Sequence, residues 1–541
     1  MRAGLAAIAA AVIGLAGCTK TGTESHGRHA WTQPGVLRIA MSLEPKSLNP
    51  LLAGSTFEGF VDRLMFEPLL SADRTGNTVP MLAAVVPTER NGGISRDGLT
   101  ITYHLRNARW SDRVPVTSHD VLWTWQAIEN SRNDVISHHG YDQVRAIDTP
   151  DARTVVVHLR RRFSPFVNTF FAESDAPYDV LPAHVLERYP EINDIPFSAG
   201  PSVVDGPFRF VAWKRGDRVV LAANPGFFAG PPRLRRIEIA FVGNEDTEVN
   251  LLRTHAIDYI FEPSSQIYPL LSGIPNARVV WMNPNAFEGM EFNLTHPIVA
   301  DPLVRRAIST AIDRTQLVKE LAHGQATVAR GDLPDWLWAF DPRVQPVRYD
   351  PGAAQALLAR AGWKMGSDGF VHKNGRPLQL LLVTETQTAT HRDESVLIQA
   401  ALHRIGVDVR VKYYPQDMLY APKGMGGILH GGRFDIVLFP WISGVDPDNS
   451  SQFACVNVPP RGYNDAHYCN PEMDAAQQAA LSHYDRAGRK AAYATIERLL
   501  ARDDPTIFFW WERQQEAISD DFRGFAPNPV VEAWNAWEWS I

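Results

Sequence analysis

Asp446 and Asp448 form an acidic pair whose type and spacing could do chemistry in this chain. Two neighbouring carboxylates can serve as the acid and the base of a glycosidase. However, the segment reads Asp-Pro-Asp-Asn, which is commonly a turn, and the sequence has no GxSxG nucleophile elbow, P-loop or Rossmann fingerprint. We therefore expect no catalytic residue and no enzyme activity, with a secreted hydrolase as the alternative from another class.

The first of the three cysteines, Cys18, ends a segment that has the features of a secretion signal. Arg2 gives a positive start, the run 5–15 is apolar, and two small residues precede the cysteine. The apolar run is too short to cross a hydrocarbon core of about 30 Å, so it predicts a cleaved signal peptide and not a membrane-spanning helix. Residues 15–18 (Leu-Ala-Gly-Cys) also resemble the bacterial lipobox, which implies a lipid on Cys18 and a polar tether over 18–34. An ordinary signal peptide with an incidental cysteine is the alternative.

The other two cysteines, Cys455 and Cys469, are expected to form a disulfide. If Cys18 carries lipid, they remain as a pair in an oxidising compartment. They are 14 residues apart, and closing a loop near that size stabilises a fold by roughly 3 kcal/mol in the chain-entropy model. Metal binding by the same cysteines is the weaker alternative, because His467 is the only histidine close to them. We expect no metal site.

The elements that must position these residues alternate between strands and helices, which indicates an α/β fold. We predict strands at 36–40, 99–105, 378–383, 407–411 and 434–439, and helices that begin after Thr117, Asp301 and Asp350 and at Asp393. Asp301 and Asp350 are each followed by Pro, the usual N-cap and first-turn pair. The strand at 434–439 ends at Pro440-Trp441, so 441–449 lies where ligands bind in open α/β sheets.

Short motifs stand in a fixed order over nearly all of the chain. They include Met65-Phe66-Glu67-Pro68-Leu69-Leu70, Asp97-Gly98-Leu99-Thr100, Trp110-Ser111-Asp112, Gly206-Pro207-Phe208, Ala311-Ile312-Asp313-Arg314 and Ala361-Gly362-Trp363. In this order they resemble family 5 of the extracellular solute-binding proteins, which comprises binders of peptides, nickel and oligosaccharides. The resemblance implies a two-lobed periplasmic-binding-protein fold of the class II type, with an extra third subdomain and a ligand cleft between the lobes.

The implied division of the chain is as follows. The signal peptide is 1–17 and the lipidated tether 18–34; the first lobe takes 35–62, 177–286 and 506–541, the extra subdomain 63–176 and the second lobe 287–505. Hinge crossings are expected near 287–293 and 506–510.

The resemblance also implies ligand-binding residues around the cleft. The candidates are Trp441, Ser443, Gly444, Asp446, Asp448, Ser55, Thr56, Phe57 and Asn293. Trp441 could instead pack in the core, and the segment 54–57 could be a plain turn. The family's peptide binders place an aspartate a few residues after the Trp to pair the α-amino group, whereas 442–445 here reads Ile-Ser-Gly-Val. Because a buried ammonium without a counter-charge is costly, either Asp446 takes that role or the ligand has no free amine.

The function implied is that of a carrier. We expect a monomeric lipoprotein, periplasmic or at the cell surface, that delivers di- and oligopeptides to the permease subunits of an ABC importer and needs no cofactor. It would touch the membrane through lipid alone. Nucleic acid is excluded as a partner, because the net charge is -7 and no long basic run follows the first residues. Carriers of a nickel chelate, haem or an oligosaccharide, and a ligand sensor, are the alternatives.

Overall fold

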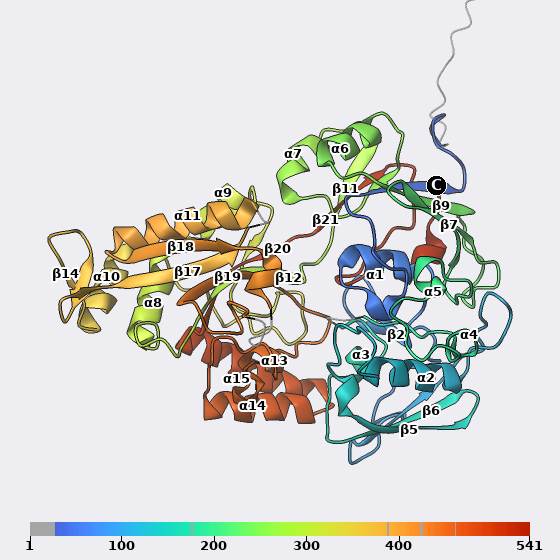
Figure 1. Cartoon of the computed structure of the whole chain (residues 1–541), viewed down its shortest axis with the longest axis horizontal. Coiled ribbons are helices and arrows are strands. Elements are labelled where there is room, and N and C mark those ends of the chain that lie inside the picture. Colours follow the sequence, from blue (N-terminus) through green and yellow to red (C-terminus); the bar gives the residue numbers. More distant parts are fainter. Residues whose placement is uncertain (1–27, 175–176, 387–388, 422–425, 460) are drawn as a thin grey trace, which may run out of the picture.

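The computed structural model describes residues 28–174, 177–386, 389–421, 426–459 and 461–541, which form two lobes of mixed α/β structure (Figure 1). The predicted signal peptide and Cys18 lie outside these residues. In the described part of the chain, no helix combines the length and the apolar character that crossing a bilayer requires.

The first lobe is built on a seven-stranded sheet in the order β11-β21-β10-β1-β9-β8-β7. Its strands are β1 (Val36–Met41), β7 (Phe208–Lys214), β8 (Arg218–Ala223), β9 (Arg236–Phe241), β10 (Tyr259–Ile260), β11 (Ala277–Trp281) and β21 (Gln515–Ser519). Its helices are α1 (Thr56–Arg63), α5 (Pro196–Ala199), α6 (Glu245–Arg253) and α7 (Tyr268–Leu271). The predicted first strand is confirmed as β1, whose buried Leu37 and Ile39 point into the core.

The extra subdomain is packed below the first lobe in the view of Figure 1. Its strands are β2 (Leu70–Ala72), β3 (Thr78–Pro80), β4 (Thr100–His104), β5 (Val144–Asp151) and β6 (Thr154–Leu159), and its helices are α2 (Ser118–Glu129) and α3 (Phe166–Thr169), with α4 (Ala183–Leu186) packed on α2. Ile101 of β4 belongs to the same hydrophobic cluster as Leu37 of β1. The subdomain and the first lobe therefore share one core.

The second lobe is built on a six-stranded sheet in the order β13-β20-β12-β19-β17-β18. Its strands are β12 (Ala286–Phe292), β13 (Thr327–Val328), β17 (Gln379–Glu385), β18 (Asp408–Tyr414), β19 (Ile436–Ile442) and β20 (Thr506–Glu512), with a small sheet of β14 (Lys364–Met365), β15 (Val371–Lys373) and β16 (Arg376–Pro377). Its helices are α8 (Pro302–Ala311), α9 (Arg314–Leu321), α10 (Pro351–Arg360), α11 (Ala389–Arg404), α12 (Gln416–Leu419), α13 (Ser450–Phe453), α14 (Pro471–Ser482) and α15 (Arg486–Asp503). One face of the sheet packs on α8 to α11, and the other on α14 and α15.

The helix starts predicted from capping residues are confirmed. Thr117 precedes α2, and its backbone NH donates to Asp120 Oδ2 at 2.7 Å. Asp301 and Asp350 accept hydrogen bonds from the first turns of α8 and α10. A short polar side chain accepts a hydrogen bond from a free amide of the first turn, which explains why these helix starts can be predicted from the sequence.

The two lobes are joined by two short connections. These are residues 282–285, between β11 and β12, and residues 513–514, between β20 and β21. The backbone NH of Met282 donates to the Gln514 carbonyl at 3.0 Å, so the connections run side by side. They differ from the crossings predicted at 287–293 and 506–510, because those residues form β12 and β20 inside the second sheet, where Met290 and Ile507 are buried.

The predicted end of the strand at 434–439 is also corrected, since β19 continues to Ile442. Pro440 is tolerated inside the strand because β17 pairs with β19 only at Ile436 and Val437, so one edge of β19 is open further on. The strand therefore carries Trp441 itself to the edge of the sheet.

Candidate ligand-binding cleft

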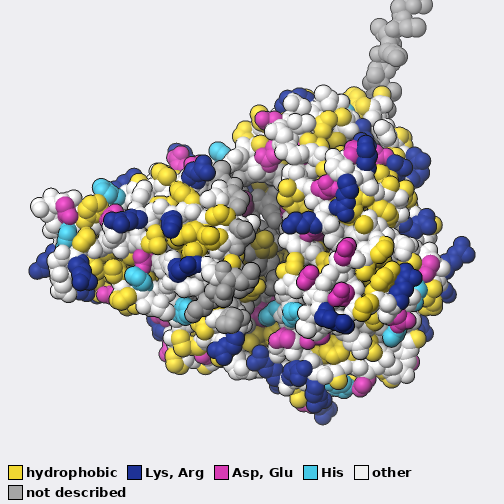
Figure 2. All heavy atoms as spheres, in the orientation of Figure 1, with side chains coloured by type: hydrophobic (Ala, Val, Ile, Leu, Met, Phe, Trp, Pro, Cys, Tyr) yellow, Lys and Arg dark blue, Asp and Glu magenta, His cyan; other side chains and the backbone are white. Residues whose placement is uncertain are grey.

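A groove separates the two lobes on the face shown in Figure 2. At the carboxyl ends of β17 and β19 the second lobe contains a cavity of about 490 Å³. The cavity is lined by Glu291, Glu385, Gln416, Tyr420, Leu429, His430, Val437, Phe439, Pro440, Trp441, Gln452, Tyr463 and Asp465. A smaller hollow beside it, lined by both the second lobe and the extra subdomain, shares Trp441. Apolar walls with a few polar groups are typical of small-ligand sites.

Most of the ionisable side chains that line the cavity are acidic. Three carboxylates, Glu291, Glu385 and Asp465, face one histidine, His430, and the lining residues of the described chain include no Lys or Arg. His430 Nδ1 lies 2.9 Å from Asp465 Oδ1, and this contact raises the pKa of the imidazole although burial opposes it. Burial raises the pKa of Glu291 well above its usual range, and the charge of Asp465 adds to the shift.

Trp441 lies on the wall that the cavity and the smaller hollow share. It is opposite Phe287 of β12 and half-buried, and its ring makes an edge contact with Tyr463 at 5.5 Å between centroids. The structure thus places this residue at the cleft, and its contact with ligand stays a prediction.

Ser443 and Gly444 continue from β19 toward the extra subdomain. The Ser443 NH donates to the Asn285 carbonyl at 2.8 Å, which fixes the loop to the connection between the lobes. A side chain on Gly444 would meet the backbone of Glu173 and Ser174 at 3.1 Å. Gly444 therefore permits a close approach of the second lobe to the subdomain.

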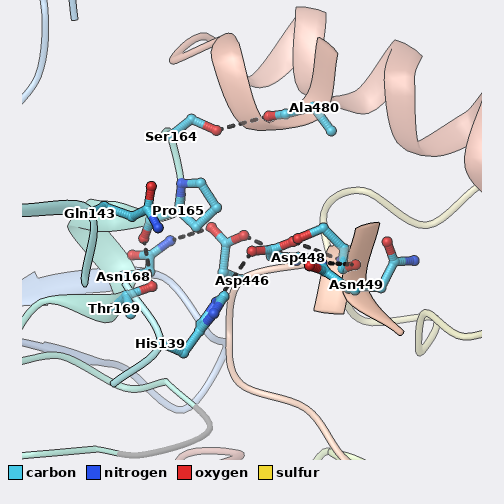
Figure 3. Close-up of polar contacts among 12 residues, drawn as sticks. His139, Gln143, Ser164, Pro165, Asn168, Thr169, Asp446, Asp448, Asn449 and Ala480 are labelled. Atoms are coloured by element: carbon cyan, nitrogen blue, oxygen red, sulfur yellow. Dashed lines mark hydrogen bonds and ion pairs between the residues drawn. The ribbon is translucent and has the colours of Figure 1, made fainter. Parts of the chain in front are cut away.

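Asp446 is bound by residues of the protein itself (Figure 3). Its two carboxylate oxygens accept hydrogen bonds from Arg489 of α15 at 2.8 and 2.5 Å, and Asn168 of the subdomain donates to Oδ2 at 3.1 Å. Only 9% of the Asp446 side chain and 6% of the Arg489 side chain are exposed. The sequence left two possibilities open: Asp446 pairs the amine of the ligand, or the ligand has no free amine. The geometry disfavours Asp446 as an anchor for an amine, because its charge is already compensated by Arg489.

Asp448 lies beside Asp446 and faces the subdomain too (Figure 3). Its Oδ2 is 3.5 Å from His139 Nε2, and its Oδ1 accepts the Ser450 NH at 3.0 Å. Burial alone would raise the pKa of Asp448, but His139 and Ser450 together hold it below its usual value. The aspartate pair therefore joins the second lobe to the subdomain.

Ser55, Thr56 and Phe57 lie at the start of α1 in the first lobe. Ser55 is the N-cap and accepts the Glu58 NH, while Thr56 donates to Glu262 Oε2 at 2.7 Å. Phe57 packs edge-on against Phe261 at 5.4 Å. The three residues are thus placed by local contacts, and none of them lines the cavity at β19.

Asn293 follows the last residue of β12 and is not among the residues that line the cavity, although Glu291 two residues earlier is. Its side-chain amide donates to the carbonyls of Gly432 and Phe434, both at 3.0 Å, and the residue is buried. The structure therefore does not bring Asn293 together with Trp441, because they stand at opposite ends of paired strands.

The disulfide between Cys455 and Cys469 is present, so this prediction is confirmed. The loop that it closes brings Tyr463 and Asp465 to the cavity wall. Sequence reasoning missed these two residues, together with Tyr420, His430 and Glu385. Glu385 ends β17, so the rule that ligands bind at the carboxyl ends of strands could have found it.

Comparison with known proteins gives a consistent result. The model of the bacterial extracellular solute-binding proteins, family 5, matches residues 77–458. The oligopeptide-binding protein AppA of Bacillus subtilis is 24% identical over 514 residues, which cover 94% of this chain and 92% of AppA. The glutathione-binding protein GsiB of Pectobacterium atrosepticum is 26% identical over 498 residues, 91% of each chain.

Solved structures share the fold. AppA from Bacillus subtilis in complex with a nonapeptide superposes with a TM-score of 0.76 and 22% identity, covering 94% of this chain and 99% of AppA. NikZ from Campylobacter jejuni in complex with Ni(L-His) gives a TM-score of 0.77 at 25% identity, covering 94% of this chain and all of NikZ. The fold is therefore the two-lobed one that the sequence predicted.

Proposed function

Because this chain belongs to the bacterial extracellular solute-binding proteins of family 5, we propose that it captures peptides outside the cytoplasm and delivers them to an ABC importer. The observation that carries the proposal is the cavity of about 490 Å³ at the carboxyl ends of β17 and β19, beside the connections between the lobes. The lobes would close over a ligand there by a hinge motion, and the permease would recognise the closed conformation.

Peptides are favoured as ligands for two reasons. The relatives AppA and GsiB are named for oligopeptides and glutathione. The walls combine aromatic rings, which pack on side chains, with an excess of carboxylates, which attract a positive charge. With Asp446 already paired to Arg489, the amino end of a peptide or a basic side chain would face Glu385 and Asp465 instead.

We also propose where the protein is held and that it acts as a single chain. The lipid on Cys18 would tether a monomeric carrier to a membrane, with permease subunits as its partners, and no catalytic turnover is part of the function. Labelling of the exported chain with a radioactive fatty acid tests the anchor. Loss of the label in Cys18→Ala is the expected result, and full labelling of that variant would contradict it.

Thermal unfolding tests the ligand class. The chain from residue 19 onward, stripped of ligand through denaturant, is compared with peptide, sugar and metal-chelate pools, because a ligand bound by the native state alone raises the midpoint. We expect a rise with peptides and a smaller rise after their amines are acetylated. A rise with sugars or chelates alone would remove the peptide assignment.

A variant of Trp441 tests the site. Trp441→Ala should weaken peptide binding by at least about tenfold, as the loss of a central aromatic contact does in other interfaces. Trp31→Ala is the matched control, because Trp31 is exposed on the first lobe and stacks on His255. Equal affinities of the two variants would place the ligand elsewhere.

A further inference from the structure

A buried group of metal-binding side chains lies next to the connection between the lobes. It consists of Glu288 of β12 and of His391 and Glu394 of α11, and one donor atom of each lies within 4.8 Å of the other two. His391 and Glu394 stand three residues apart, so they share one face of the helix. Two elements of the second lobe thus converge on one small volume.

The histidine has the surroundings of a metal ligand. His391 Nε2 is 3.1 Å from Glu288 Oε2, and Nδ1 is 3.4 Å from Glu385 Oε1. Histidines that bind metals almost always give their second ring nitrogen to a carboxylate or a carbonyl, which fixes the orientation of the ring. Here Glu385 is the carboxylate within ion-pair distance of Nδ1, which makes no hydrogen bond among the described residues, and Nε2 faces Glu288.

The second glutamate provides an independent observation. Both carboxylate oxygens of Glu394 are fully buried, and neither has a hydrogen-bond partner among the described residues. Burying a carboxylate without a partner costs several kcal/mol, so such groups normally pair or bind a cation. A cation between the three side chains would give Glu394 the partner that it lacks.

The distances suit a small ion after a modest contraction. Ligand atoms around a tetrahedral ion at about 2.0–2.2 Å lie about 3.4 Å from one another. The Nε2–Oε2 distance of 3.1 Å already meets this requirement. No two of the three donor atoms are more than 4.8 Å apart, so the contraction required is at most about 1.4 Å, which side-chain rotation can supply.

We infer that Glu288, His391 and Glu394 bind a divalent transition-metal ion, Zn²⁺ or Ni²⁺. One imidazole with two carboxylates selects these ions over Ca²⁺ and Mg²⁺, which take oxygen ligands alone. Three protein ligands leave the fourth position to water. This inference does not rest on the proposed peptide function, because the ligands come from the protein alone.

The ion would also stabilise the second lobe by linking two of its elements. Glu288 lies two residues into the strand that follows the connection 282–285, and α11 packs on the sheet around it. An ion held by both elements would fasten β12 to α11 next to the hinge. Its binding free energy would add to the stability of the second lobe.

The same three side chains could also be stable without an ion, and an experiment can distinguish the two cases. Although burial opposes it, the contacts with Glu288 and Glu385 raise the pKa of His391 to about 10, and burial raises the pKa of Glu394. A protonated histidine between two carboxylates, beside a neutral Glu394, would be a stable arrangement without any ion. In that case no metal would bind at these residues.

Isothermal titration of the chelator-treated chain from residue 19 onward, without peptide, tests the inference with Zn²⁺, Ni²⁺, Mn²⁺ and Ca²⁺. We expect one saturable site for Zn²⁺ or Ni²⁺, at least a hundredfold weaker in Glu394→Gln and His391→Asn, and about 10- to 100-fold weaker in Glu385→Gln. His372→Asn is the matched control, since His372 is on the surface within 3.0 Å of Asp368. It should bind as the wild type does.

A spectroscopic arm guards against variants that fail to fold. Co²⁺ added to the wild-type chain should give the visible absorption of a tetrahedral site, and Zn²⁺ should displace it. Absence of a saturable site in the wild type would overturn the inference, and so would unchanged affinity in folded Glu394→Gln and His391→Asn. Failure here would leave the peptide-binding result untouched, because the peptide pools are tested separately.

Discussion

Two acidic regions border the cleft, and they differ in how their charges are compensated. At the subdomain end, Asp446 is held by Arg489 and Asn168, and Asp448 faces His139. At the hinge end, Glu288 and Glu385 contact His391, and the neighbouring Glu394 has no hydrogen-bond partner in the described chain.

The difference separates structural charges from charges available for recognition. A carboxylate that is already paired has little to gain from a ligand, whereas an unpaired one gains a partner that folding did not supply. The loop with Asp446 and Asp448, which the sequence suggested as a ligand site, therefore connects the subdomain to the second lobe. Glu394 at the hinge end is a carboxylate of the second kind, since neither of its oxygens has a hydrogen-bond partner among the described residues.

The largest expected effect comes from breaking the paired region. Arg489→Met leaves Asp446 buried without its cation, and loss of one member of a buried pair costs about 3–5 kcal/mol. Urea unfolding should show the loss. The matched control is Arg486→Met, an exposed arginine of the same helix, which should stay within about 0.5 kcal/mol of the wild type.

A double variant sharpens this result. Asp446→Leu combined with Arg489→Met removes both charges and should recover most of the stability lost in the single variant. If Arg489→Met alone unfolds at the wild-type urea concentration, Asp446 is not held by Arg489. The role of amine anchor would then return to Asp446.

A somewhat smaller effect is expected from the disulfide. Replacing Cys455 and Cys469 by serine should cost about 3 kcal/mol and weaken ligand binding, because the loop between them supplies Tyr463 and Asp465 to the cavity. Urea unfolding and peptide titration of the variant measure both effects. Dithiothreitol should then change the wild type and leave the serine variant unaffected; a stable variant with full affinity would show that the wall does not need the covalent link.

The smallest effect is a pH dependence at the paired end. The pKa of Asp448 is lowered in the folded protein, so its contribution to stability is present above its ordinary pKa and is lost as the pH falls through the lower, folded value. Asp448→Asn should therefore flatten the acid limb of the unfolding midpoint below about pH 4. Asp246→Asn, on the exposed side of α6, is the control, and an unchanged acid limb in Asp448→Asn would refute the assignment.

Much of the fold could be predicted from the sequence because its signals are local. Thr117, Asp301 and Asp350 marked helix starts through their own side chains, and alternation of apolar with mostly polar residues marked the strand that forms β4. The end of β19 could not be predicted in the same way. Pro440 normally ends a strand, and only the absence of pairing beyond Val437 on one side explains why it does not.

The site was harder to predict because it is assembled from distant segments. Trp441 was found through its place at the end of a strand, and the structure puts it on the cavity wall. The partner of Asp446 is 43 residues away in the sequence, so no local pattern could show that its charge is compensated. The i, i+3 spacing of His391 and Glu394 was visible, but Glu288 lies 103 residues before His391.

The order in which the sheets can be completed follows from the position of the last two strands. β20 lies between β13 and β12, and β21 lies between β11 and β10, so neither strand is at an edge. Neither large sheet can therefore be completed before residues 506–519, near the end of the chain, have been added. A growing or truncated chain that stops before residue 506 would expose unpaired strands in both lobes, which slows folding and invites aggregation. The two lobes, although separate as bodies, are coupled as folding units.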